Sequence, residues 1–236
     1  MPPRPAHPPP PPYRPPATTL ETTAADAISP PLSPVALRHA PPRLFLAGDT
    51  RLLRAPARVS VVGSRDASSA GRRRAAKLAR LLVQAGVVIV SGLARGIDHA
   101  AHTAAMAAGG RTIAVLGTPL TRCYPPEHAP LQALLCRDHL VVSQFPADTP
   151  TRPACFPARN RLMALVSHAS VIVEARDRSG SLSHGAEALR LGQPLFLMRN
   201  VVDDTRVRWP ARFLDRGALV LDQVQSVLDA LPGRTP

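Results

Sequence analysis

The sequence predicts an α/β fold with a doubly wound, mostly parallel sheet and helices on both faces. Three short apolar runs, at residues 59–62, 87–90 and 171–174, each lead into a turn of small residues that opens a helix-like segment. Strand, small-residue turn and helix in succession are typical of βαβ units. Because open α/β sheets bind ligands at the carboxyl ends of their strands, the three turns predict a site at that edge.

The first segment of the chain predicts no core of its own. Residues 8–12 are all proline, and a patch rich in threonine and alanine follows. Burying so little apolar surface does not offset an ordering cost of about 1–2 kcal/mol per residue. We therefore expect residues 1–34 to form a disordered proline-rich tail and residues 35–236 to form the folded domain.

The domain is expected to alternate strands and helices. Residues 41–49 predict a lead-in strand and turn, and residues 69–85 predict a basic, alanine-rich helix that ends at Gly86. Further strands are expected at 112–116, 140–143, 195–198 and 219–221. Further helices are expected at residues 98–108, 129–136 and 222–231. One more helix is expected to begin near residue 159, and another to end near residue 215.

Composition points to an anionic partner. The formal net charge is +13 and the pI is near 11.4, although a coding bias toward Ala, Arg and Pro is an alternative source of the arginine excess. Cys123, Cys136 and Cys155 form no Cys-x-x-Cys pair, which favours a reducing compartment without a structural metal site. With no apolar signal-peptide core and no run of membrane-spanning length, we expect a cytoplasmic protein without a membrane partner.

The first turn pairs glycine with arginine, a combination suited to phosphate. Glycine lets backbone N–H groups approach an anion, the following helix N-terminus adds partial positive charge, and arginine supplies a bidentate fork. Gly63 and Ser64 precede Arg65 here. We expect Arg65 to contact phosphate; a salt bridge to a neighbouring carboxylate is the alternative.

The second turn offers the same chemistry. Ser91, Gly92 and Gly96 are expected to supply backbone donors, and Arg95 either enters the pocket or faces solvent. Asp98, at the helix start, is expected to cap that helix and orient neighbouring donors rather than act as a catalytic acid.

A proline-containing loop brings three polar residues to another helix start. Arg159 and Arg161 are both candidates to hold phosphate, and Asn160 to bridge loops; Arg161 alternatively lies on the surface. Phe156 offers a stacking face to a base, worth about 1–3 kcal/mol, or else anchors the loop in the domain.

The third turn, Ser179, Gly180 and Ser181, is expected to donate backbone and hydroxyl hydrogen bonds to an anion. The sequence contains no Walker-type glycine-rich motif, no metal-ligand cluster and no nucleophile elbow. We therefore expect no catalytic residues, no metal and no cofactor.

Taken together, these motifs resemble one protein family. They are Gly63-Ser64-Arg65, residues 91–98, Tyr124-Pro125, residues 156–161 and Ser179-Gly180-Ser181-Leu182. Their order and spacing make residues 41–220 similar to the DNA-processing protein A family, also called DprA or Smf. The resemblance implies an extended Rossmann-like fold, a homodimer, a basic pocket for single-stranded DNA, and loading of the RecA recombinase during natural transformation. We accordingly expect a non-enzymatic recombination mediator.

Several positions depart from the family pattern while the three turns keep it. They are Pro119, Thr121, His128, Gln144, Arg199 and Asn200, and they are expected on the rim between the turns.

A second hypothesis is a nucleotide sensor or phosphoribohydrolase-like enzyme that uses the same pocket. The related lysine-decarboxylase-like phosphoribohydrolases share this sheet, and Glu187 falls where their glutamate lies. An exposed helix glutamate is the alternative reading of that residue. Release of base from nucleoside monophosphates would discriminate the two hypotheses.

Overall fold

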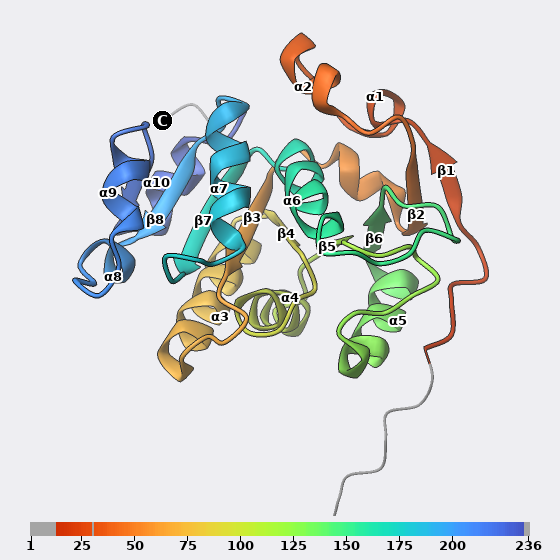
Figure 1. The fold of residues 1–236 in the computed structure, drawn as a ribbon, viewed down its shortest axis with the longest axis horizontal. Coiled ribbons are helices and arrows are strands. Elements are labelled where there is room, and N and C mark those ends of the chain that lie inside the picture. Colours follow the sequence, from red (N-terminus) through yellow and green to blue (C-terminus); the bar gives the residue numbers. More distant parts are fainter. Residues whose placement is uncertain (1–12, 30, 234–236) are drawn as a thin grey trace, which may run out of the picture.

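The computed structural model describes residues 13–29 and 31–233, which contain nine strands. They are β1 (Leu20–Thr22), β2 (Leu44–Gly48), β3 (Arg58–Gly63), β4 (Val88–Ser91), β5 (Thr112–Leu116), β6 (Leu140–Ser143), β7 (Ala169–Glu174), β8 (Leu195–Met198) and β9 (Leu219–Leu221). All of them join one sheet in the order β1-β2-β6-β5-β4-β3-β7-β8-β9 (Figure 1).

The sheet is parallel from β6 to β9, while β2 pairs antiparallel with β6, and β1 with β2. From β3 the chain winds outward through β4 and β5 to β6, and then returns to place β7 on the other side of β3. This reversal makes the carboxyl ends of β3 and β7 the switch point at which such sheets bind ligands. The predicted fold class is confirmed.

Helices cover both faces of the sheet (Figure 1). They are α1 (Ala24–Ala27), α2 (Pro34–His39), α3 (Ser69–Gln84), α4 (Ile97–Ala107), α5 (Ala129–Asp138), α6 (Cys155–Leu165), α7 (Ser181–Arg190), α8 (Arg199–Val202), α9 (Trp209–Leu214) and α10 (Val224–Asp229). Short 3-10 helices lie at Thr50–Arg54 and Pro126–His128.

Neighbouring residues of β3 show why the apolar runs are continuous. Val61 packs into a buried cluster with side chains of α3, α4 and α10, whereas Val62 packs into a second cluster with side chains of α6, α7 and α9. Since successive strand residues point to opposite faces, a strand covered on both sides is apolar at every position.

The N-terminal boundary differs from the prediction. β1 pairs with the edge of β2, and Ile28, just after α1, is buried in the core. Upstream of both, the Tyr13 hydroxyl donates to the carbonyl oxygen of Leu120 at 3.0 Å. Backbone pairing with β2 supplies hydrogen bonds and burial that the composition of this segment did not indicate.

The folded part of the chain therefore begins before residue 35, and the expectation of disorder throughout residues 1–34 is wrong for residues 13–29. Residues 1–12, which hold the proline block, lie outside the described residues.

Candidate functional site

A cavity of about 660 Å³ opens at the carboxyl ends of β3 and β7. Gly63, Ser64 and Arg65 line it from the first turn, and the third turn (residues 179–181) lines it from the other side. The two turns are far apart in sequence and meet because β3 and β7 are neighbours in the sheet.

The mouth of this cavity carries a cation stacked on an aromatic ring. The guanidinium carbon of Arg65 lies 5.0 Å from the centroid of the Phe156 ring. The ring of Tyr124 lies 5.5 Å from that of Phe156, tilted by 50°. A Cβ at Gly117 would come within 2.7 Å of the Phe156 ring, so the position beside the ring must be small. Arg65, Tyr124 and Phe156 also line a second cavity of about 210 Å³.

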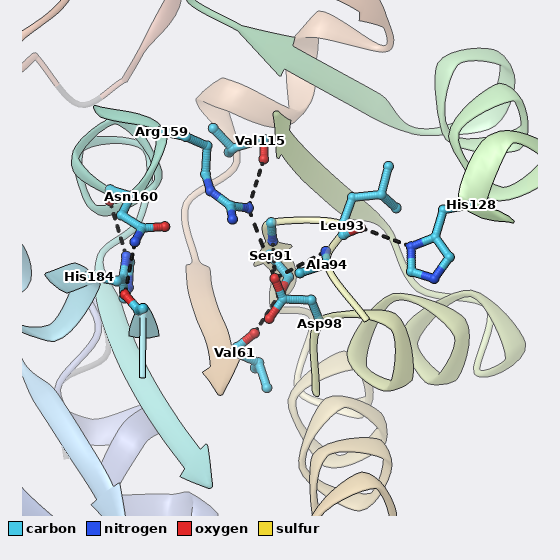
Figure 2. A network of polar contacts seen from close by, with 12 residues as sticks. Val61, Ser91, Leu93, Ala94, Asp98, Val115, His128, Arg159, Asn160 and His184 are labelled. Carbon is cyan, nitrogen blue, oxygen red and sulfur yellow. Dashed lines mark hydrogen bonds and ion pairs between the residues drawn. The ribbon is translucent and has the colours of Figure 1, made fainter. Parts of the chain in front are cut away.

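The second turn has a structural role. The Ser91 hydroxyl donates to the carbonyl oxygen of Val61 at 2.7 Å. The backbone N–H groups of Gly92 and Ala94 both donate to Oδ2 of Asp98, at 3.2 and 3.3 Å (Figure 2). The expected backbone donation by Gly92 to a ligand is therefore corrected, because Asp98 takes this hydrogen, and the orienting role expected for Asp98 is present.

Gly96 serves the close approach of α4 to the first turn. Its φ of 74° is unfavourable for other residues, and a Cβ there would collide with the carbonyl oxygen of Ser64. The next residue, Ile97, donates its backbone N–H to that same oxygen at 3.2 Å. Gly96 thus lets the start of α4 pack directly against the first turn.

Arg159 forms the floor of both cavities and is only 5% exposed. Its Nη1 donates to the carbonyl oxygen of Val115 at 3.2 Å and lies 4.0 Å from Oδ2 of Asp98 (Figure 2). Burial raises the pKa of the Asp98 carboxyl, and the Arg159 guanidinium opposes that rise. A Cβ at Gly92 would collide with the Arg159 guanidinium, so glycine is needed here for packing.

Carboxylates of the chain itself occupy several helix starts near this edge. At the start of α3, Glu174 accepts hydrogen bonds from the backbone N–H (2.8 Å) and the hydroxyl of Ser68. At the start of α9, Oδ1 of Asp177 accepts two successive backbone N–H groups, at 2.9 and 3.1 Å. Asp98, the second residue of α4, accepts N–H groups of the turn that precedes this helix. The helix that follows the first turn is thus not free to hold an added anion, contrary to the sequence argument.

The start of α7 is different. In the described part of the chain, the backbone N–H groups of Gly180 and Ser181 have no hydrogen-bond partner. Asn160 bridges from α6 to this turn, as expected, donating to the carbonyl oxygen of Gly180 (3.0 Å) and to the hydroxyl of Ser183 (2.6 Å). The Ser179 and Ser181 hydroxyls lie 2.8 Å apart. Free backbone donors at a helix N-terminus form a ready anion site.

Besides Arg159, two arginines of the sequence-predicted set lie in ion pairs. Arg95 lines the smaller cavity but pairs with Glu127 at the surface. Arg161 lies 3.4 Å from the carboxylate of Glu187, which also pairs with Arg190. Among the described residues, Arg161 is not part of the lining of either cavity, so its surface alternative holds.

Sequence reasoning missed two exposed arginines, Arg176 and Arg178, which line the larger cavity. Both follow the carboxyl end of β7 directly, as Arg65 follows β3. The same rule that selected Arg65 could have found them, because any basic residue just past a parallel strand faces the ligand edge.

The six departures from the family pattern lie outside the linings of the two cavities. Within the described residues, none of these positions lines either cavity. His128 instead contacts the turn before α4. Its Nδ1 lies 2.9 Å from the carbonyl oxygen of Leu93, a non-glycine residue with a φ of 57° (Figure 2). The expectation that all six belong to the rim of the site is therefore wrong.

Within residues 13–29 and 31–233, no group of three or more His, Cys, Asp or Glu side chains is placed to hold a metal ion. No helix there combines the length and apolar character needed to cross a bilayer.

Residues 22–232 match the sequence model of a family described as DNA recombination-mediator protein A. The DNA processing protein DprA of Streptococcus pneumoniae is 40% identical over 190 residues, which cover 80% of this chain and 66% of that protein. Protein Smf of Escherichia coli is 38% identical over 192 residues, covering 81% of this chain and 51% of that protein. The chain thus spans about half to two thirds of the length of these relatives.

Two solved structures are similar throughout the fold. The X-ray structure of S. pneumoniae DprA superposes with a TM-score of 0.76 at 36% identity, covering 86% of this chain and 72% of that one. A Helicobacter pylori DNA processing protein A, described for its single-stranded DNA binding mode, gives a TM-score of 0.74 at 28% identity, covering 90% and 94%.

Proposed function

This chain belongs to the DNA recombination-mediator protein A family, and from that premise we propose that its larger cavity binds single-stranded DNA and that the protein acts as a recombination mediator without catalytic activity. The proposed setting is the cytoplasm, and the proposed partners are single-stranded DNA, a second copy of the chain and the RecA recombinase. The binding mode described for the H. pylori relative supports the first of these partners.

The observation that carries the proposal is the joint placement of Arg65, Phe156 and the open start of α7 in one cavity. A guanidinium and free backbone N–H groups suit a phosphate, and an aromatic ring suits an unstacked base. Arg176 and Arg178 add positive charge at the mouth, where they attract a polyanion from solution.

A single strand fits this arrangement better than a duplex. In a duplex the base faces are stacked on their neighbours, so Phe156 would have no ring to contact. In a single strand the faces are accessible, and stacking on an aromatic side chain contributes about 1–3 kcal/mol per base. The cavity of about 660 Å³ is a pocket for a nucleotide unit rather than a groove for two strands.

No observation favours the nucleotide-hydrolase hypothesis. Its candidate catalytic residue, Glu187, is paired with both Arg161 and Arg190. Among the described residues, Glu187 lines neither cavity. We therefore propose no catalytic role for it.

The test is strand-selective binding measured across salt. Fluorescence anisotropy with oligo(dT) and with a hairpin duplex of equal length should show tighter binding of the single strand. Affinity should fall steeply with added salt, because each phosphate contact releases counterions. Equal affinity for both DNAs, or none for either, would refute the proposal. Light scattering and pull-down with RecA test the two protein partners separately.

A further inference from the structure

A separate groove of about 610 Å³ lies between α3, α10 and the carboxyl ends of β8 and β9. Among the described residues, it shares no lining side chain with either cavity of the candidate site. Its floor is apolar: Leu78 and Leu221 are buried, and Leu81, Met198 and Val224 are half-buried around them. We call it the α3–α10 groove.

The α3 rim of this groove is cationic. Arg74 and Lys77 lie one turn apart on α3, and both line the groove. Within the part of the chain that the structure describes, neither of these two side chains makes a hydrogen bond or an ion pair. On the facing rim, Arg199 is neutralised by a two-bond pair with Asp222, with both distances 2.7 Å. Asp203 is a second carboxylate on that rim, so the positive charge that no carboxylate of the described residues pairs with lies on the α3 side.

We propose that the α3–α10 groove binds a short acidic, amphipathic segment of a protein partner. Apolar side chains of that segment would cover Leu78, Leu81 and Val224, and its carboxylates would pair with Arg74 and Lys77. Peptide-binding grooves commonly combine an apolar floor that supplies affinity with a charged rim that sets orientation. The charge of the α3 rim selects for carboxylates on the side of the segment that faces it.

The composition of the lining argues against a second nucleic-acid site. None of the described residues that line the groove is aromatic, so it offers no face on which a base can stack. A phosphate chain would contact the two cations but would leave the apolar floor uncovered. An acidic peptide uses both features.

Because the groove and the DNA pocket have separate linings, both ligands can be bound at once. The partner would therefore be recruited to a protein that already holds DNA, rather than compete for its site.

The experiment selects random short peptides displayed on phage against the immobilised full chain, with the DNA pocket saturated by oligo(dT). We expect the enriched sequences to combine Asp or Glu with Leu, Ile, Val or Met. A labelled synthetic peptide of the consensus should bind the wild type, and Lys77→Glu should weaken it about tenfold or more through like-charge repulsion. Arg80→Glu is the matched control, since Arg80 is an exposed cation on the same helix outside the groove.

Four results would overturn the proposal. They are a selection that enriches no acidic sequence, a consensus peptide that binds Lys77→Glu as tightly as the wild type, a loss of oligo(dT) affinity in Lys77→Glu but not in Arg80→Glu, and self-association that only Lys77→Glu abolishes. The third would assign the groove to DNA and the fourth to a second copy of the chain.

Discussion

The guanidinium of Arg65 stacks on the ring of Phe156, and the two residues come from opposite halves of the chain. Both side chains line the larger cavity. The pair therefore links the phosphate-binding and base-stacking parts of the proposed site.

Removing either member of this pair should weaken single-strand binding across all sequences. We expect Phe156→Ala to cost about 1–3 kcal/mol of binding free energy, the range for one stacked base. Arg65→Ala should lower the slope of log affinity against log salt by about 1, the value for one lost phosphate contact. Anisotropy titrations with oligo(dT) at several salt concentrations measure both.

Arg80→Ala and Arg161→Ala are the controls for Arg65→Ala, since both are exposed arginines outside the linings of the cavities. If they reduce affinity as much as Arg65→Ala does, binding is a property of overall charge and not of the pocket.

The glycines of the second and third turns should respond differently to alanine. At Gly92 an added Cβ collides with the guanidinium of Arg159, so Gly92→Ala should displace the floor and destabilise the fold by about 1–3 kcal/mol. At Gly180 a Cβ meets nothing within 4 Å, and the residue has a φ of −61°. Gly180→Ala should therefore keep or slightly raise stability, by up to about 1 kcal/mol. Urea unfolding compares the two.

Gly180→Ala should also keep oligo(dT) affinity, because the substitution leaves the backbone N–H donors of α7 in place. A strong loss of affinity with an intact fold would show that a ligand atom occupies the space of the added methyl group.

Breaking the buried pair of Asp98 and Arg159 should be costly. Asp98→Ala leaves the Arg159 guanidinium in the interior without its counter-charge and frees the N–H groups of Gly92 and Ala94. We expect a loss of about 3–5 kcal/mol in the free energy of unfolding, measured by denaturant titration. A loss below about 1 kcal/mol, the value of a surface pair, would contradict the buried geometry.

Buried histidines should make the protein less stable as the pH falls. Burial lowers the pKa of His102 to about 3 and that of His184 to about 4, from an ordinary value of 6.5. Their folded pKa lies below the unfolded one, so the unfolded state binds more protons between these values. The stability that the neutral rings contribute is present above about pH 6.5 and is lost as the pH falls toward 4.

His184→Asn tests this pH dependence. Below pH 6.5, the unfolding free energy of the variant should depend less steeply on pH than that of the wild type. The difference in slope should reach up to about 1.4 kcal/mol per pH unit, the value for one proton. Equal slopes in wild type and His184→Asn would mean that His184 does not titrate on unfolding.

A shortened chain that begins at Val35 should be less stable than one that begins at Tyr13. The shorter chain lacks β1 and Ile28, which exposes the edge of β2 and removes a buried side chain from the core. We expect a lower thermal midpoint and greater aggregation, and the substitution Ile28→Ala alone should cost about 2–5 kcal/mol. Equal melting curves for the two chains would restore the boundary that composition predicts.

The strands, the turns and most of the helices could be predicted because their signals are local. Continuous apolar runs such as residues 59–62 predict strands covered on both faces, and glycine marks the turns that follow. β1 could not be predicted in this way. Its three residues pair through the backbone with β2, and backbone pairing leaves no pattern in so short a segment.

The sequence alone thus determined the fold class and the edge of the sheet at which the site lies, because both follow from the periodicity and turn chemistry of contiguous residues. Only the tertiary structure decided which donors remain free for a ligand. Glu174 accepts hydrogen bonds from Ser68, 106 residues away in sequence, and Asp98 accepts those of the second turn. Among the described residues, the N–H groups at the start of α7 have no such acceptor. A hydrogen bond depends on distance and direction in space, which the order of residues does not state.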